Sequence, residues 1–457
     1  MRIDLGQKDR ANVAPAQEAE AIEEIAPSRD SIRIARLPIH FFTAAVILFG
    51  LGVAAAPWVV DDLVDFFYQP RILAVTHTFT LGWISSAIMG VMYRVVPALT
   101  KRPLRFSRLA RWQFWLFLIG ATGLIAHMLI GEWAPTWMSA AVIVLSAAFF
   151  ALNMLYCLGP AWRQSAAETG MCMSVLFLLV AASLGMVLAL DKSLGFLPGS
   201  VLSNLASHAH LAALGWVSLT ICAVSYRMAP AFLLSELTLP RVAMWQLYSL
   251  ATGVAGLGLS LLGWIPGASI WSVAIMLALL AYIAVLQSLV RNRRIPIDWT
   301  MRHALVGIVC LVLSVGLGFW LLWIDPGSAI GNRVAGAYGV LGLLGWVTNF
   351  IIGMSYKLFP GFVVGVRERR GWPKLAIAEL SLLRCRPLVF FLMNAGVLTL
   401  AGGLITAQVA VARLGALVIA LGGLIYVAVM ARTLSYAYRS SVPRATSDPF
   451  RILDGGS

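Results

Sequence analysis

The sequence predicts an all-α, multi-pass membrane protein with twelve transmembrane helices in three pseudo-symmetric four-helix units. Three observations predict this fold. The chain of 457 residues is 60% hydrophobic and only 12% charged, whereas soluble domains average about 25% charged residues. Uncharged apolar runs recur along its whole length, and one short motif returns every fourth run.

The twelve helices follow from these apolar runs. At about 1.5 Å of rise per residue, a helix of about 20 residues crosses roughly 30 Å of hydrocarbon. The runs lie near residues 38–58, 73–94, 112–131, 136–158, 171–190, 204–226, 243–264, 269–290, 304–324, 335–356, 388–407 and 411–431. Polar tails at residues 1–36 and 435–457 flank them.

Lysine and arginine predict which loops face the cytoplasm. Cations gather before the first helix and after every even-numbered one, as at Lys101 and Arg102, whereas Asp61 and Asp62 mark the opposite side. Positively charged loops stay on the cytoplasmic side, so we expect both termini there and the helices in a bacterial inner membrane. These loops account for the net charge of +14. The expected partner is therefore the lipid bilayer and not nucleic acid.

An internal repeat divides the helices into three units. Leu-Gly-Trp occurs in the second, sixth and tenth helices, and each copy continues with Tyr, then Arg or Lys, then Pro at identical spacing. The repeated residues are Gly82, Trp83, Tyr93, Arg94 and Pro97; Gly215, Trp216, Tyr226, Arg227 and Pro230; and Gly345, Trp346, Tyr356, Lys357 and Pro360. Four crossings per unit keep every unit in one orientation, which predicts an axis along the membrane normal. The predicted units are 37–160, 161–298 and 299–434.

Most repeated residues have a structural explanation. Glycine permits close helix contact, tryptophan fills the space beside it, the Tyr-Arg or Tyr-Lys pair anchors the helix at the headgroup level, and proline ends the helix. Ser85, Ser218 and Thr348 lie two residues after each tryptophan. They either bond their own backbone, which we favour, or line an inner polar track.

Four of the six histidines are predicted to share one layer in the outer part of the bilayer. They are His77, His127, His208 and His210. Three lie in the first turns of helices that run inward, and one lies about fifteen residues into a helix that runs outward. His40 and His303 begin helices on the cytoplasmic side, where we expect interfacial positions.

The histidine layer predicts ligands for a metal centre. His77 and His210 share one repeat position, six residues before the tryptophan, so the three-unit symmetry places them at equal depth. The third unit has Val340 at that position, and Tyr338 matches His208. Neutral imidazole ligates haem iron and copper. The alternative is that these histidines only pack against neighbouring helices.

The motif around His77, together with the helix count, resembles the catalytic subunit of the haem–copper oxidase and nitric-oxide reductase superfamily. The resemblance covers the architecture of nearly the whole chain and the motifs of the second, sixth and tenth helices. It implies that His77 ligates a low-spin haem. The family's His-x-His lies on the tenth helix, whereas His208 and His210 lie on the sixth, and the seventh helix has no histidine for a copper site. The divergent twelve-helix haem and copper family linked to nitrosative stress (NnrS) is a closer analogue.

The leading hypothesis is therefore one b-type haem between His77 and His210 or His208, with His127 as a third candidate or a supporting residue. Copper is a second candidate cofactor. If the chain is an enzyme, we expect a haem-dependent oxidoreductase in respiration or nitric oxide metabolism, supplied by a cytochrome, a quinone or a respiratory subunit. The runner-up is a non-haem carrier or assembly factor for copper or another small solute. A third hypothesis is that the chain is a structural subunit of a respiratory complex.

Overall fold

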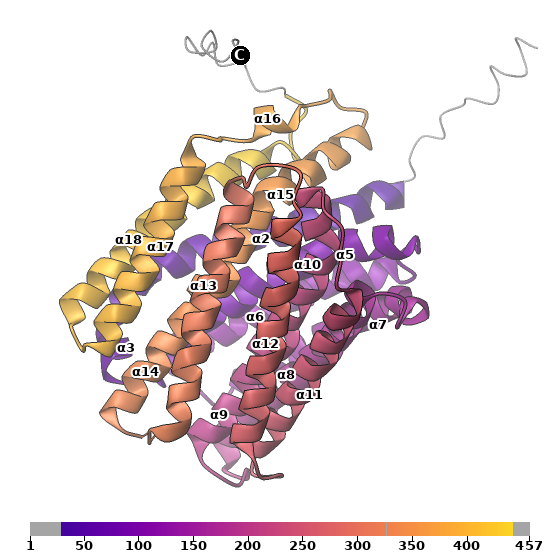
Figure 1. The fold of residues 1–457 in the computed structure, drawn as a ribbon. Coiled ribbons are helices and arrows are strands. Elements are labelled where there is room, and N and C mark those ends of the chain that lie inside the picture. Colours follow the sequence, from indigo (N-terminus) through magenta and orange to yellow (C-terminus); the bar gives the residue numbers. More distant parts are fainter. Residues whose placement is uncertain (1–28, 326, 442–457) are drawn as a thin grey trace, which may run out of the picture.

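A computed structural model describes residues 29–325 and 327–441 (Figure 1). The described chain is helical and contains no strand. It has twelve helical spans long and apolar enough to cross a membrane, one for each predicted run. The two described ends lie at the same end of the bundle (Figure 1), as an even number of spans requires. The predicted tails at 1–28 and 442–457 lie outside the described residues.

The helices follow the predicted order, and each unit has four spans. The first unit contains α2 (Arg29–Ala55), η1 (Ala56–Val59), α3 (Val60–Asp65), α4 (Pro70–His77), η2 (Thr78–Ser85), α5 (Ser86–Thr100), α6 (Ser107–Ile130), α7 (Thr136–Leu158) and η3 (Gly159–Ala161). The second contains α8 (Ala166–Leu194), α9 (Val201–His210), η4 (Leu211–Ser218), α10 (Leu219–Leu233), α11 (Pro240–Leu261) and α12 (Ala268–Arg291). The third contains α13 (Trp299–Trp320), η5 (Leu321–Trp323), α14 (Ala329–Val340), η6 (Leu341–Thr348), α15 (Asn349–Glu368), α16 (Ile377–Leu380), α17 (Cys385–Ile405) and α18 (Val409–Ser435).

The second span of each unit lies on the inside of the ring. About two thirds or more of its most apolar window is buried, against 22% for the span of α8 and for that of α13. The segments η2 and η6 contact each other, as do η4 and η6, so the three repeated motifs meet near a common axis. Contacts between α18 and α2 close the ring of units.

Each inner span contains a π-helical segment at the same place. The segments η2, η4 and η6 are each eight residues long and begin one residue after His77, His210 and Val340. A π-helix has a wider turn than an α-helix, is rare, and frequently occurs at functional sites. The wider turn changes the direction in which all following side chains point. The three repeats share this local geometry as well as their residues.

The glycine of each Leu-Gly-Trp motif explains how these segments pack. A Cβ added to Gly82 would lie 2.7 Å from the Cβ of Leu48, and one added to Gly215 would lie 2.5 Å from the ring of Phe177. Gly345 is equally close to Cys310. In each unit the motif therefore lies directly against the unit's first span, at a distance that only glycine permits.

The prediction that proline ends these helices is wrong. The spans continue past Pro97, Pro230 and Pro360, and end at Thr100, Leu233 and Glu368. A proline inside a helix removes one backbone donor, but its fixed φ suits the helix, and neighbouring helices in a membrane protein compensate for the lost bond. The inner spans are consequently longer at this end than the apolar runs indicated.

Candidate functional site

The structure places the predicted ligands directly before the π-helical segments. His77 is the last residue of α4, and His210 is the last residue of α9. Val340 ends α14 in the same way. The three residues are thus equivalent in structure, as their spacing predicted, and His208 lies half a turn before His210.

Backbone carbonyls fix the tautomer of three imidazoles. The Nδ1 of His77 lies 2.7 Å from the carbonyl of Leu73, and that of His210 lies 2.7 Å from the carbonyl of Ala206. The Nδ1 of His208 lies 3.0 Å from the carbonyl oxygen of Ala181 on α8. A carbonyl only accepts, so each Nδ1 carries the proton and donates it. The Nε2 of each ring then has the lone pair, which is the arrangement that metal-ligating histidines use.

These residues meet across the junctions between units. His208 of the second unit and His77 of the first occupy the same repeat positions as Tyr338 and His210, so the repeat symmetry places them toward each other. Tyr338 of the third unit donates its hydroxyl to the Nε2 of His210 of the second, at 3.1 Å. Both pairs consist of the same two repeat positions. At the third junction these positions are Val75 and Val340, which have no polar side chain.

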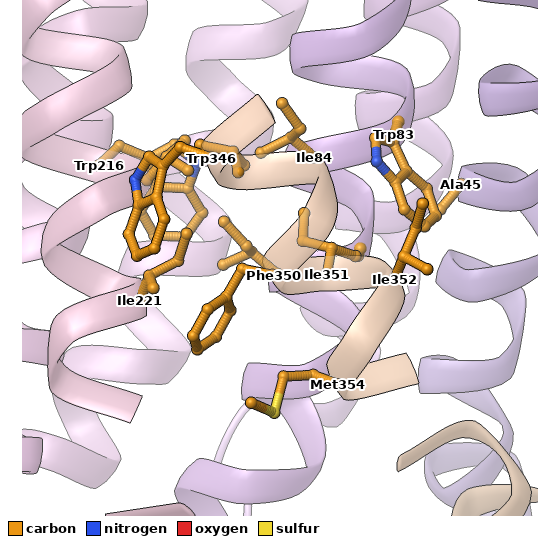
Figure 2. Close-up of a cluster of buried hydrophobic side chains, with 14 of the residues drawn as sticks. Ala45, Trp83, Ile84, Trp216, Ile221, Trp346, Phe350, Ile351, Ile352 and Met354 are labelled. Carbon is orange, nitrogen blue, oxygen red and sulfur yellow. The ribbon is translucent and has the colours of Figure 1, made fainter. Parts of the chain in front are cut away.

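The repeated tryptophans connect the units one layer deeper. Trp216 donates its Nε1 hydrogen to Ser85 at 3.2 Å, and Trp346 donates to Ser218 at 3.2 Å. The corresponding third pair is Trp83 with Thr348. Both are fully buried, yet the indole nitrogen of one and the hydroxyl of the other have no hydrogen-bond partner among the described residues. In Figure 2, Trp83 lies on one side of α15, and Trp216 and Trp346 lie on the other.

The sequence did not reveal the second role of the serines, as acceptors for a neighbouring unit. Ser218 bonds the carbonyl of Ala213, as we favoured, but it also accepts the indole hydrogen of the next unit. The signal was the constant two-residue spacing between tryptophan and hydroxyl in all three repeats. The spacing could not show that Trp216 and Trp346 each reach the hydroxyl of a different unit.

His127 stays apart from the other histidines of the layer. It lies near the end of α6, beside Leu124 and Met128, which pack on Leu73 and Ala74 of α4. Its Nδ1 is buried and has no hydrogen-bond partner in the described chain. Within residues 29–325 and 327–441, no three His, Cys, Asp or Glu side chains come close enough to share a metal ion. The four predicted ligands are therefore not assembled around one ion.

We expected His303 to be interfacial, but it is completely buried. Its Nδ1 bonds the side-chain oxygen of Asn349 at 2.8 Å, and Asn349 in turn bonds Asn394 at 2.9 Å. Gly353 of α15 permits this burial, because a Cβ there would lie 2.6 Å from the carbonyl oxygen of Thr300 and 2.9 Å from the Cβ of His303. The first turn of α13 is thus drawn against α15 and away from the surface.

The donor chemistry at the His77 and His208 junction fits the axial positions of haem iron. Two imidazoles from different units occupy the repeat positions that His210 and Tyr338 occupy at the next junction, each with its Nδ1 hydrogen engaged by a carbonyl. A copper ion held by three histidines does not fit, because the described residues contain no cluster of three donors.

Comparisons with known proteins support the fold. No protein-family model matches this chain, and no curated protein matches it. Among solved structures, the chain is similar to a heme-copper terminal oxidase dimer determined by cryo-EM. The two share 13% sequence identity with a TM-score of 0.58, over 90% of this chain and 84% of the other. Similarity at this level shows a common fold, and it confirms the architecture that the sequence predicted.

Proposed function

We propose that this chain is a membrane haem protein that holds one b-type haem between His77 and His208, at the junction of the first and second units. The observation that carries the proposal is that these two imidazoles occupy the same repeat positions as Tyr338 and His210, which bond across a junction, with Leu73 and Ala181 fixing their tautomers. The shared fold with a haem–copper terminal oxidase supports it.

A bound haem would supply one-electron transfer or gas-binding chemistry in this layer. His77 and His208 would hold the iron through Nε2, and the carbonyls of Leu73 and Ala181 would orient both rings and increase their basicity. Since the chain has no Cys-x-x-Cys-His motif, any haem would be bound noncovalently.

His210 has a different part in this proposal. Ala206 accepts the hydrogen of its Nδ1, and its Nε2 accepts the hydroxyl hydrogen of Tyr338. With both ring nitrogens engaged, His210 joins the second unit to the third and does not ligate iron. His127, one span away on α6, would be a neighbour of the site and not a ligand.

The proposed role is respiratory electron transfer or nitric oxide and oxygen metabolism without a complete binuclear centre. The chain would lie in a bacterial inner membrane with both termini in the cytoplasm. A cytochrome, a quinone or another respiratory subunit would supply electrons. If the protein turns over a substrate, it would be a haem-dependent oxidoreductase.

The test is a reduced-minus-oxidised optical spectrum of the detergent-purified protein, with iron and copper analysis of the same samples. We expect a b-type band in the wild type that is lost in His77→Ala and in His208→Ala. The matched control is His210→Ala, which has the same substitution two residues away and should keep the band. Loss of the band in His210→Ala but not in His208→Ala would refute the assignment.

Absence of both haem and copper, in protein made with adequate haem, would contradict the redox function altogether. The fold would then serve a non-haem carrier, an assembly factor for copper or another solute, or a structural subunit of a respiratory complex.

A further inference from the structure

A cavity of about 320 Å³ opens beside the first turns of α2 and α6. This end of the bundle, which we call the basic end, bears the arginine-rich loops predicted to be cytoplasmic. The cavity is lined by Arg33, Arg36, Leu37, His40, Arg111, Phe114 and Trp115. Four of the described lining residues are cationic or imidazole and three are apolar, and none of these described residues is a carboxylate.

The fold holds several cationic side chains close to this cavity. The guanidinium of Arg36 lies over the ring of Tyr438, 5.6 Å from its centroid, and the His40 ring stacks on the same tyrosine. The pKa of Arg370, in the loop after α15, is lowered by burial and secondly by the charge of Arg36. Among the described residues, no carboxylate pairs with Arg33 or Arg36. Like charges held this close favour an anion, and guanidinium suits phosphate oxygens.

The apolar half of the wall indicates which kind of anion is bound. Trp115 is 54% exposed. Trp112, which follows the lining residue Arg111 on the same helix, is 64% exposed. Exposed tryptophans at a helix end are typical of the headgroup level of a membrane. Phe114 and Leu37 extend the apolar surface inward. A soluble phosphate would use only the arginines, whereas a phospholipid would use both halves of the wall.

We propose that this cavity binds the phosphodiester headgroup of an anionic phospholipid through Arg33, Arg36 and Arg111, with an acyl chain against Phe114 and Trp115. Basic pockets between helices at the cytoplasmic surface are suited to such headgroups. The bound lipid would hold the first turns of α2 and α6 together.

A second cavity at the same end provides a matched control. It has a volume of about 590 Å³ and is lined by Arg227, Arg294 and Glu236 among other residues. It also has two arginines at the membrane surface, but its carboxylate offsets part of their charge and no aromatic residue lines it. The proposal therefore requires lipid selectivity at the first cavity and not at the second.

Native mass spectrometry of the detergent-purified full chain tests this, with phosphatidylglycerol and phosphatidylcholine as probes. We expect the wild type to retain phosphatidylglycerol preferentially. The double variant Arg33→Gln with Arg36→Gln should weaken that binding about tenfold or more. The control, Arg227→Gln with Arg294→Gln, should bind as the wild type does. Equal loss in both double variants would overturn the proposal, because it would indicate nonspecific attraction to the basic end.

A second measurement does not depend on the variants. Phosphatidylglycerol should raise the thermal unfolding midpoint of the wild type more than phosphatidylcholine does. Inorganic phosphate at equal concentration should not displace the lipid. Displacement by phosphate alone would show a soluble-anion site, and equal effects of the two lipids would show no headgroup recognition. Either result would refute the lipid assignment.

Discussion

Two junctions between the units are joined by a buried hydrogen bond between a repeated tryptophan and a hydroxyl, whereas the third is joined by apolar and aromatic packing. Trp216 and Trp346 each donate to a hydroxyl of the preceding unit. Where the first and third units meet, neither Trp83 nor Thr348 has such a bond in the described chain, and an exposed ion pair joins Arg413 to Asp61, 2.6 Å apart. The repeat has kept the same positions at all three junctions but not the same chemistry.

This difference has an energetic consequence. A buried polar atom without a partner costs about 1–3 kcal/mol relative to its hydrated state. Exposed ion pairs, such as that of Arg413 with Asp61, contribute little, about 0–1 kcal/mol. The closing junction should therefore be the least stable of the three, and substitutions at equivalent positions should have unequal effects.

The largest expected effect is at the glycine that brings η4 against α8. Gly215→Leu would place new atoms into the ring of Phe177 and displace Trp216 from Ser85. We expect a loss of about 3 kcal/mol or failure to fold, measured as the thermal unfolding midpoint in detergent. Gly339→Leu is the control, since a Cβ at Gly339 meets nothing within 4 Å. Equal effects of both variants would contradict the close packing.

The tryptophans provide the most direct comparison between junctions. Trp216→Phe removes a hydrogen bond and leaves Ser85 buried without its donor, whereas Trp83→Phe removes a donor that has no acceptor. Both variants lose similar apolar area. We expect Trp216→Phe to be more destabilising, by on the order of 2 kcal/mol, in denaturant unfolding. Equal losses would mean that Trp83 is satisfied in the native protein.

Substitutions of the hydroxyl partners test the same difference between junctions, with smaller expected changes in stability. Ser218→Ala leaves the indole nitrogen of Trp346 without an acceptor and should cost about 1–2 kcal/mol. Thr348→Val replaces an unpaired buried hydroxyl by a methyl group of the same shape. It should be neutral or stabilise the protein by up to about 1 kcal/mol. A clear destabilisation by Thr348→Val would show that this hydroxyl has a partner.

The smallest expected effect is at Tyr338. The variant Tyr338→Phe keeps the ring beside His210 and removes only the 3.1 Å hydrogen bond. We expect a cost of about 1 kcal/mol and an unchanged optical spectrum. A changed spectrum would instead place His210 at the cofactor.

The sequence predicted the depth of each residue in the membrane better than the direction in which its side chain points around the helix. Apolar runs and the Leu-Gly-Trp repeat were sufficient for twelve spans, three units and the equivalence of His77 with His210. They could not show that Tyr338 bonds His210 across a junction, because each residue turns a helix by about 100° and a π-helical segment changes that angle. The wider turns of η2, η4 and η6 had no distinct sequence signal.

His303 shows a second limit of sequence reasoning. Its position at the start of an apolar run predicted the membrane surface, but burial depends on the neighbouring helix, where Gly353 leaves room for the first turn of α13. The prolines show a third. Pro97 ends a run of apolar residues without ending the helix, because the packed neighbours of α5 maintain it. In each case tertiary contacts decided the outcome.

The central claim is that the first junction holds a haem through His77 and His208. The optical spectrum of His208→Ala beside that of His210→Ala tests it most directly. We expect the b-type band to disappear in the first variant and to persist in the second, with iron content following the band. A band that survives His208→Ala at full intensity would contradict it.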